Sequence, residues 1–124
     1  MSEPLHGVVV CHGDLAKALV AAVEEISGIH GVLTPITNTG ADRTMLENRV
    51  ALAADGHPTM IFVDLPSGSC LFAAMRRLAG HEGVRVVTGV NLAMLLEFIF
   101  HRDLGLDAAT ARVLEAGARA IGGR

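Results

Sequence analysis

The 124-residue sequence contains no tryptophan and no tyrosine, so four phenylalanines supply all of its 3% aromatic content. Its 10 Lys and Arg residues are dispersed along a chain whose formal net charge is −3. Such a chain has neither an aromatic platform on which bases stack nor a basic groove that follows a phosphate backbone. We therefore expect no nucleic-acid partner.

Cysteine is scarce as well, because Cys11 and Cys70 are the only two in the sequence. Two cysteines are too few for the disulfide framework of a small secreted domain, and the first residues, "MSEPLHG", do not resemble a signal peptide. No uninterrupted apolar run approaches the roughly 18 to 20 residues that a membrane-spanning helix needs. We therefore expect one soluble, cytoplasmic domain over residues 1–124, with reduced thiols and no direct membrane insertion.

Four short runs rich in β-branched residues predict strands at residues 6–11, 30–36, 59–65 and 84–90. Two of them are almost continuously apolar, which is typical of parallel strands covered by helices on both faces. Segments with the period of an amphipathic helix separate the strands. Their apolar faces consist of Leu15, Leu19, Ala22, Val23 and Ile26, then Met45, Leu46, Val50 and Ala53, then Leu71, Phe72, Met75 and Leu78. Two further helices are expected after the last strand.

Capping residues mark the expected helix boundaries. The candidate N-caps are Asp14, Asp42, Ser69, Asn91 and Asp107, and the glycines placed just beyond helix ends are Gly28, Gly56, Gly80 and Gly105. This alternation predicts an α/β fold with three layers, in which helices cover both faces of a doubly wound, mainly parallel four-stranded sheet. Residues 118–121 either complete the last helix or form a short C-terminal edge strand.

Open parallel sheets bind ligands beyond the carboxyl ends of their strands, near the point where the strand order reverses. Polar or glycine-rich segments follow three of the predicted strands, at residues 11–14, 64–69 and 88–91. The segment after the second strand, "TNTGAD", is interpreted as an ordinary loop. If the first, third and fourth strands are neighbours, His12, Asp64 and Ser69 meet in one crevice.

These residue types suit phosphoryl transfer. A carboxylate bonded to one ring nitrogen fixes the tautomer of a histidine and leaves the other nitrogen as a nucleophile, so Asp64 is the candidate orienting group for His12. The backbone N–H groups of Gly13, Gly68 and Ser69, at expected helix starts, would bind phosphate oxygens. Because no nucleotide-binding loop is present, we expect the phosphoryl donor to be another protein, with no cofactor and no metal.

Other interpretations of the same residues stay open. Asp64 could cap the turn "DLPSG", and Ser69 could be a plain N-cap. Cys11, His12 and Cys70 would form an incomplete zinc set, because no C-x-x-C pair is present. A receiver-like domain phosphorylated on Asp64 would need acidic residues after the first strand to hold magnesium. The remaining histidines are interpreted as structural or solvent-facing: His6, His30, His57, His81 and His101.

Three blocks, "GVVVCHGDLAKAL", "IFVDLPSGSCLFAA" and "VVTGVNLAMLLEF", resemble the IIA component of the mannose/fructose family of the bacterial phosphoenolpyruvate-dependent sugar phosphotransferase system. The likeness extends over essentially the whole chain. It implies a single IIA-type phosphocarrier domain, in which His12 accepts a phosphoryl group from the histidine-containing phosphocarrier protein and passes it to a IIB subunit. It also implies that Asp64 hydrogen-bonds this histidine, and that Ser69 matches the serine of the family's D-x-x-G-G-S-P motif.

The resemblance further implies a homodimer whose short C-terminal strand, near residues 118–121, is exchanged between subunits. Two residues depart from the family motif: Ser67 and Cys70 stand where glycine and proline are usual. Serine adopts positive φ less readily than glycine, whereas Cys70 restores an N–H that proline lacks. The alternative function is a regulatory module of an incomplete relay, which binds a partner according to its phosphorylation state.

Overall fold

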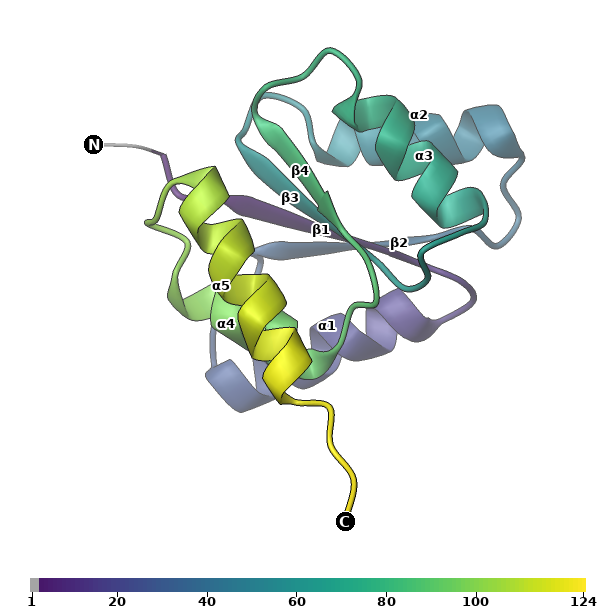
Figure 1. The fold of residues 1–124 in the computed structure, drawn as a ribbon. Coiled ribbons are helices and arrows are strands. Elements are labelled where there is room, and N and C mark those ends of the chain that lie inside the picture. Colours follow the sequence, from purple (N-terminus) through teal and green to yellow (C-terminus); the bar gives the residue numbers. More distant parts are fainter. Residues whose placement is uncertain (1–2) are drawn as a thin grey trace.

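Four parallel strands form the central sheet of the computed structural model, which describes residues 3–124 (Figure 1). The strands are β1 (His6–Cys11), β2 (Leu33–Thr37), β3 (Thr59–Val63) and β4 (Val84–Val87), and their order in the sheet is β2-β1-β3-β4. The central strands β1 and β3 are the two with continuous apolar runs, and they are almost entirely buried. Pro35 is tolerated in β2 because that strand lies at the edge of the sheet.

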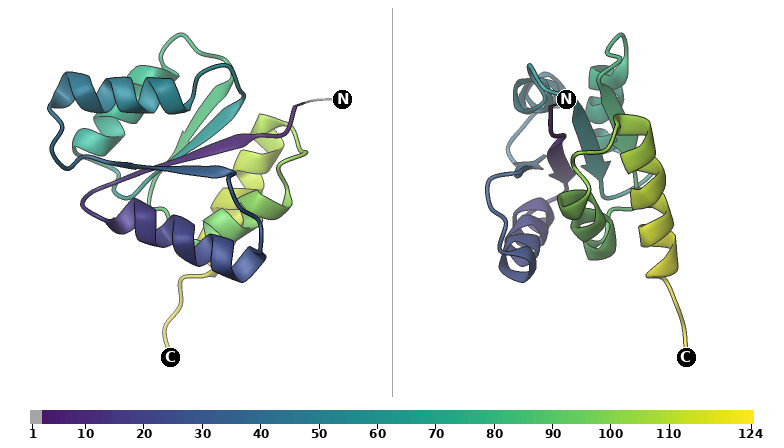
Figure 2. Two further views of the ribbon diagram at one scale, coloured as in Figure 1. Left: turned by 180° about the vertical axis from the view of Figure 1, so that it is seen from behind. Right: turned by 90° about the vertical axis from the view of Figure 1, so that its left-hand side faces the viewer.

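Five helices cover the two faces of this sheet. They are α1 (Leu15–Ser27), α2 (Arg43–Ala53), α3 (Ser69–Leu78), α4 (Leu92–Phe100) and α5 (Leu106–Arg119). Helices α2 and α3 lie on one face, and α1, α4 and α5 lie on the other (Figures 1 and 2). The predicted three-layer α/β/α architecture is confirmed. Among residues 3–124, no helix combines the length and the apolar character that crossing a membrane requires.

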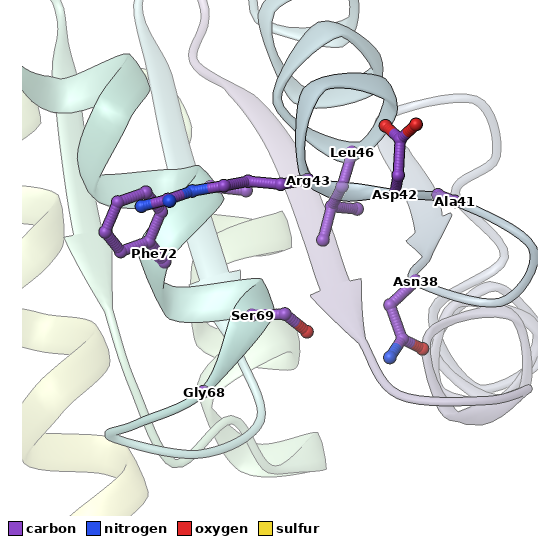
Figure 3. Close-up of a pocket in the computed structure, with 9 residues that line it drawn as sticks. Asn38, Ala41, Asp42, Arg43, Leu46, Gly68, Ser69 and Phe72 are labelled. Atoms are coloured by element: carbon purple, nitrogen blue, oxygen red, sulfur yellow. The ribbon is translucent and has the colours of Figure 1, made fainter.

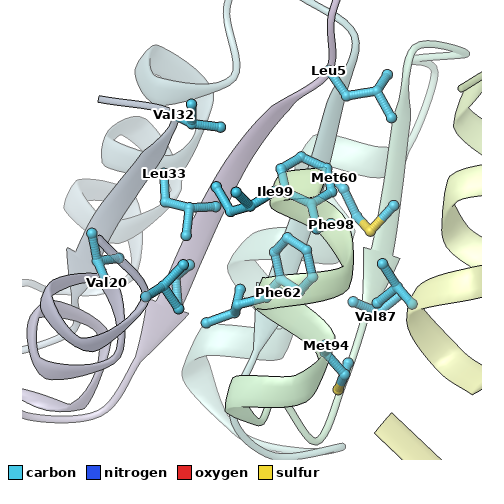
Figure 4. Packing of buried hydrophobic residues seen from close by; sticks show 14 of the residues in the cluster. Leu5, Val20, Val32, Leu33, Met60, Phe62, Val87, Met94, Phe98 and Ile99 are labelled. Atoms are coloured by element: carbon cyan, nitrogen blue, oxygen red, sulfur yellow. The ribbon is translucent and has the colours of Figure 1, made fainter. Parts of the chain in front are cut away.

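Each face of the sheet has its own hydrophobic core. The larger core joins β1, β3 and β4 to α1, α4 and α5, and Phe62 and Phe98 meet in it edge to face with ring centroids 5.2 Å apart (Figure 4). The smaller core places Val8 and Val63 of the sheet against α2 and α3. Alternate residues of β1 and β3 point to opposite faces, so both strands contribute to both cores.

The observed boundaries differ from the expected ones in small ways. Strand β2 starts at Leu33 and not at residue 30, while β3 and β4 end at Val63 and Val87, before the expected residues 65 and 90. Asp42 and Asn91 are helix N-caps as predicted, since their side chains accept hydrogen bonds from main-chain N–H groups three residues later.

Two of the expected N-caps, Ser69 and Asp107, are wrong, whereas Asp14 does occupy the N-cap position of α1. The side chain of Asp14 makes no capping hydrogen bond from that position. Ser69 is the first residue of α3, whose N-cap is Gly68. Gly105 does not follow a helix end but is itself the N-cap of α5, so Asp107 lies in the first helical turn. A carboxylate there still interacts favourably with the helix dipole.

The C-terminal segment resolves one open alternative. Residues 118 and 119 complete α5, and residues 120–124 form no strand in this chain. They extend away from the three layers (Figures 1 and 2). In the single chain, completion of the last helix is therefore the correct alternative for residues 118 and 119, because the α-helical pattern of "ATARVLEAGAR" continues to Arg119.

The strand order places its reversal between β1 and β3. From β1 the chain passes through α1 to β2 on one side, and from β2 it passes through α2 to β3 on the other side of β1. Such a reversal leaves a crevice beyond the carboxyl ends of the two central strands. The residues that follow β1 and β3 are therefore the first place to look for a functional site.

Candidate functional site

His12 and Asp64 lie directly beyond the ends of β1 and β3. The sheet register pairs Val10 with Val63, so Asp64 is level with Cys11 and one residue behind His12. Oδ2 of Asp64 accepts a hydrogen bond from the main-chain N–H of His12 at 2.9 Å and lies 2.7 Å from Nδ1 of its ring. The predicted meeting of these two side chains is found in the structure.

The two partners differ in their access to solvent. The side chain of His12 is 42% exposed, whereas that of Asp64 is 9% exposed. With Nδ1 donating to a carboxylate, the ring presents Nε2 as its free nitrogen, with a lone pair in the neutral tautomer. Asp64 therefore fixes the orientation of the imidazole, and its Nε2 atom is accessible to an incoming group.

Asp64 is kept as a carboxylate by its hydrogen bonds. Burial raises the pKa of this carboxyl, but hydrogen bonds from the main chain and ring of His12 and from the N–H of Leu65 outweigh burial and hold the pKa below its usual value. A negative charge on Asp64 favours a proton on Nδ1 of His12. This charge would also stabilise the ring once Nε2 carries a substituent.

The start of α3 forms the wall opposite the ring. Gly68 has a φ of +92°, and a Cβ built on it would lie 3.8 Å from Cε1 and from Nε2 of His12. A glycine there allows the main chain to turn into α3 close to the ring. Ser69 follows as the first residue of that helix, so its side chain and the first N–H groups of α3 face the same crevice.

The loop after β2 also belongs to the site, contrary to its interpretation as an ordinary loop. The N–H of Gly13 donates to Oδ1 of Asn38 at 3.2 Å, and Oγ1 of Thr37 donates to the carbonyl oxygen of Gly13 at 2.7 Å. Arg49 in turn donates to the carbonyl oxygens of Thr37 and Thr39. Sequence reasoning missed these residues because "TNTGAD" has the composition of any polar turn.

A cavity of about 480 Å³ opens between the first turns of α2 and α3 (Figure 3), and Gly68, the glycine next to the His12 ring, is one of its lining residues. Ser69 and Asn38 extend into it from opposite sides, and Arg43 reaches across its far end to lie 3.7 Å from the ring centroid of Phe72. Its remaining lining is mostly apolar. The lining residues are Asn38, Ala41, Asp42, Arg43, Leu46, Gly68, Ser69, Phe72 and Ala73.

Cys11, His12 and Cys70, the three residues considered above as an incomplete zinc site, do not lie together in the structure. Cys11 packs in the larger core and Cys70 in the smaller one, on opposite faces of the sheet. Burial raises the pKa of the Cys11 thiol to about 12, and burial also raises that of Cys70, so neither is a ready thiolate ligand. Cys70 does approach the site, with Sγ 3.8 Å from Nδ1 of His12. One possible ligand atom from each of His12, Asp64 and Cys70 lies within 4.8 Å of the other two.

The segment after β4 has a different role from the other two. Asn91 caps α4 through Met94 and donates from its amide to the carbonyl oxygen of Gly117. These bonds join the start of α4 to the end of α5. The segment thus stabilises the helical layer and makes none of the described contacts with His12 or Asp64.

Comparison with known proteins agrees with this geometry. The family described as "PTS system fructose IIA component" matches residues 7–115 of the chain. No curated protein sequence matches it.

Solved structures share the fold at low sequence identity. A phosphotransferase system component EIIA from Streptococcus agalactiae superposes with a TM-score of 0.89 at 18% identity, covering 96% of both chains. A mannose/sorbose-specific IIA subunit from Enterococcus faecalis gives 0.84 at 24% identity and covers 100% of this chain and 96% of that one. A IIA protein associated with the fucose utilization operon of Streptococcus pneumoniae gives 0.84 at 21%, covering 98% and 94%.

The family match extends over most of the chain and includes β1 from Gly7 onward, β3 and the segments that carry His12, Asp64 and Ser69. The structural likenesses establish the same three-layer fold independently of sequence identity. The chain therefore belongs to the family of PTS system fructose IIA components.

Proposed function

We propose that this chain is a phosphoryl carrier of a sugar phosphotransferase system. In this proposal His12 accepts a phosphoryl group from the histidine-containing phosphocarrier protein and passes it to a IIB subunit, in the cytoplasm. The observation that carries the proposal is the 2.7 Å contact between Nδ1 of His12 and Oδ2 of Asp64. That contact leaves Nε2 as the ring atom directed at the crevice beside Gly68.

The transfer step needs no metal or nucleotide. The lone pair of His12 Nε2 forms a bond to phosphorus while the phosphorus–nitrogen bond of the donor phosphohistidine breaks, and the electron pair of that bond returns to the donor imidazole. The Nδ1 proton of His12 stays on the ring and remains hydrogen-bonded to Asp64, whose charge balances the positive charge of the phosphorylated ring. Positioning and charge stabilisation are most of what phosphoryl transfer requires of a protein.

The phosphoryl oxygens would be received at the start of α3. Ser69 Oγ and the main-chain N–H groups of Gly68 and Ser69 are the proposed donors, aided by the positive end of the helix dipole. Gly13 is the third proposed contact, although its N–H donates to Asn38 in the unphosphorylated chain. A phosphoryl oxygen would have to replace the Asn38 oxygen as acceptor of that hydrogen bond.

The test is phosphorylation of the purified chain by the upstream relay with labelled phosphoenolpyruvate. His12→Ala should abolish labelling, and His81→Ala, which changes an exposed histidine after α3, should not. The label should be lost in acid and retained in alkali, as expected for phosphohistidine. Undiminished labelling of the His12 variant, or a label lost in alkali as from phosphoaspartate, would refute the proposal.

The regulatory alternative differs in the second step. A carrier transfers its phosphoryl group to a IIB acceptor, whereas a binding module keeps the group until it is hydrolysed. Adding a purified IIB subunit to the phosphorylated chain therefore separates the two functions. Rapid loss of label from the chain with matching gain on the acceptor is the outcome that the carrier proposal requires.

We also propose that the protein works as a homodimer, as the family resemblance implies. Residues 120–124 extend from α5 without pairing in the single chain, and Ile121 among them is 78% exposed. A second copy would give this segment an apolar partner. Light scattering on the full chain and on a variant lacking residues 120–124 tests the proposal, which requires a dimer only for the full chain.

A further inference from the structure

Two histidines and a glutamate gather at the opposite edge of the sheet from His12. His6 is the first residue of β1, and His57 lies two residues before the first residue of β3. The two imidazole rings stack with centroids 3.9 Å apart and planes 4° from parallel, and a carboxylate oxygen of Glu3 contacts Nδ1 of His57. One possible ligand atom from each of the three side chains lies within 4.8 Å of the other two.

The main chain holds these residues in place. The N–H of His6 donates to the carbonyl oxygen of Pro58 at 2.9 Å, and Oγ1 of the buried Thr59 donates to the carbonyl oxygen of His57 at 2.9 Å. The same two strands that fix His12 and Asp64 at one end therefore fix His6 and His57 at the other. The side chains themselves remain accessible, since Glu3 and His57 are exposed and His6 is half-buried.

We infer that Glu3, His6 and His57 form a binding site for a divalent transition-metal ion, with Zn²⁺ as the best match. Two imidazoles and one carboxylate are a ligand set that zinc accepts, with water in the fourth position. The two nitrogen ligands and the single carboxylate make Ca²⁺ and Mg²⁺, which prefer several oxygen ligands, poorer fits. The bound ion would link Glu3 in the N-terminal segment to the first residue of β1 and to the segment that precedes β3.

Two features limit the affinity of this site. A metal ion lies in the plane of each imidazole that binds it, so the stacked rings must tilt apart before both can coordinate one ion. Arg102, which donates to the carbonyl oxygen of Leu5 at 2.7 Å, places a positive charge near His6. The Glu3 carboxylate offsets this charge. Binding also requires neutral imidazoles, so it weakens as the solution is acidified.

The experiment is a calorimetric titration of the full-length, unphosphorylated chain with Zn²⁺, repeated with Co²⁺ and followed by absorption spectroscopy. His6→Gln, His57→Gln and Glu3→Gln should each weaken binding at least about tenfold, because each removes a ligand. His30→Gln is the matched control at another exposed histidine beside a glutamate, Glu24. His12→Gln and Cys70→Ser control for metal binding at the phosphoryl site.

The inference requires one ion per chain, a loss of affinity in the three ligand variants, and unchanged affinity in the three controls. The Co²⁺ complex should show no thiolate charge-transfer band. Zn²⁺ should also raise the Tm of the parent chain but not that of His6→Gln or His57→Gln, whose Tm without metal shows that they are folded. Absence of binding at micromolar metal, or binding lost with His12→Gln or Cys70→Ser and kept in the ligand variants, would overturn the inference.

Discussion

One oxygen atom of Asp64, Oδ2, contacts His12 twice, at its main-chain N–H and at Nδ1 of its ring. The first contact fixes the residue relative to β3, and the second fixes the orientation of the ring. Both depend on the parallel pairing of β1 and β3, which brings the ends of the two strands to the same edge. The orientation of the His12 ring thus depends on the pairing of the two strands that precede His12 and Asp64.

Asp64→Asn should leave the fold intact and slow phosphorylation of His12 by at least about tenfold, a typical effect of removing a group that orients a histidine. The amide carries no charge to balance the phosphorylated ring, and it can present its NH₂ group to either nitrogen of His12. The measurement is the initial rate of labelling by the upstream phosphocarrier. Asp103→Asn changes an exposed carboxylate between α4 and α5 and serves as the control. Equal rates for the two variants would remove the orienting role.

The same carboxylate should make stability depend on pH in the acid range. Because the pKa of Asp64 is lower in the folded chain than in the unfolded chain, its contribution is fully present above about pH 4 and is lost as the pH falls through the folded value. Hydrogen bonds to a charged group contribute about 1.5–3 kcal/mol. Urea unfolding should show Asp64→Asn less stable than the parent at neutral pH, with the difference shrinking on acidification. A difference that stays constant down to about pH 2 would contradict this linkage.

Gly68→Ala should impair phosphorylation more than its loss of stability explains. A residue other than glycine at φ +92° and ψ −172° costs about 1–3 kcal/mol, and here the added methyl group also stands 3.8 Å from Nε2 of His12. Gly28→Ala is the matched control, because Gly28 has a φ of +73° at the end of α1 and its added Cβ meets nothing within 4 Å. Labelling rates and urea unfolding of both variants make the comparison. If Gly28→Ala slows labelling as much as Gly68→Ala does, proximity to the ring is not the cause.

Phe98→Ala should lower the free energy of unfolding by about 3–5 kcal/mol, because it leaves a cavity beside Phe62 in the larger core. Phe100→Ala, two residues further along α4, removes the same ring from a side chain that is 58% exposed. That change should cost less than about 1 kcal/mol. Urea denaturation of the two variants measures the contrast. Similar losses of unfolding free energy for the two variants would mean that Phe100 is buried against another molecule and is not exposed as in the single chain.

The architecture could be predicted from the sequence because the signals were local and repeated. Continuous apolar runs identify β1 and β3 as central strands, and helical periodicity between the runs identifies the crossovers. In a parallel sheet the residues that follow neighbouring strands lie at the same edge. The sequence therefore predicts that His12 and Asp64 meet if β1 and β3 are neighbours. The family resemblance then supplied the proposed partners, which no pattern in the chain encodes.

The missed features depend on contacts between distant segments. Asn38 lies 25 residues from Gly13, and only the folded sheet shows that its amide accepts the N–H of that glycine. The stacking of His6 on His57 joins residues that appear unrelated in the sequence. Serine is a common N-cap residue, but Gly68 and not Ser69 occupies the N-cap of α3, because the turn requires a positive φ.

The sheet divides the protein into two cores of unequal size, and the proposed phosphoryl site lies beyond the ends of β1 and β3, the strands that contribute to both cores. The helices of the smaller core, α2 and α3, bury fewer large side chains and should open to solvent at a lower free energy than α1 and α4. Their amide hydrogens should therefore exchange with deuterium sooner. Those two helices also form the walls of the cavity beside Ser69. If the chain exchanges phosphoryl groups with two proteins as proposed, the half of the site that adapts to each partner is the one that opens more easily, while the imidazole is held by the more stable half.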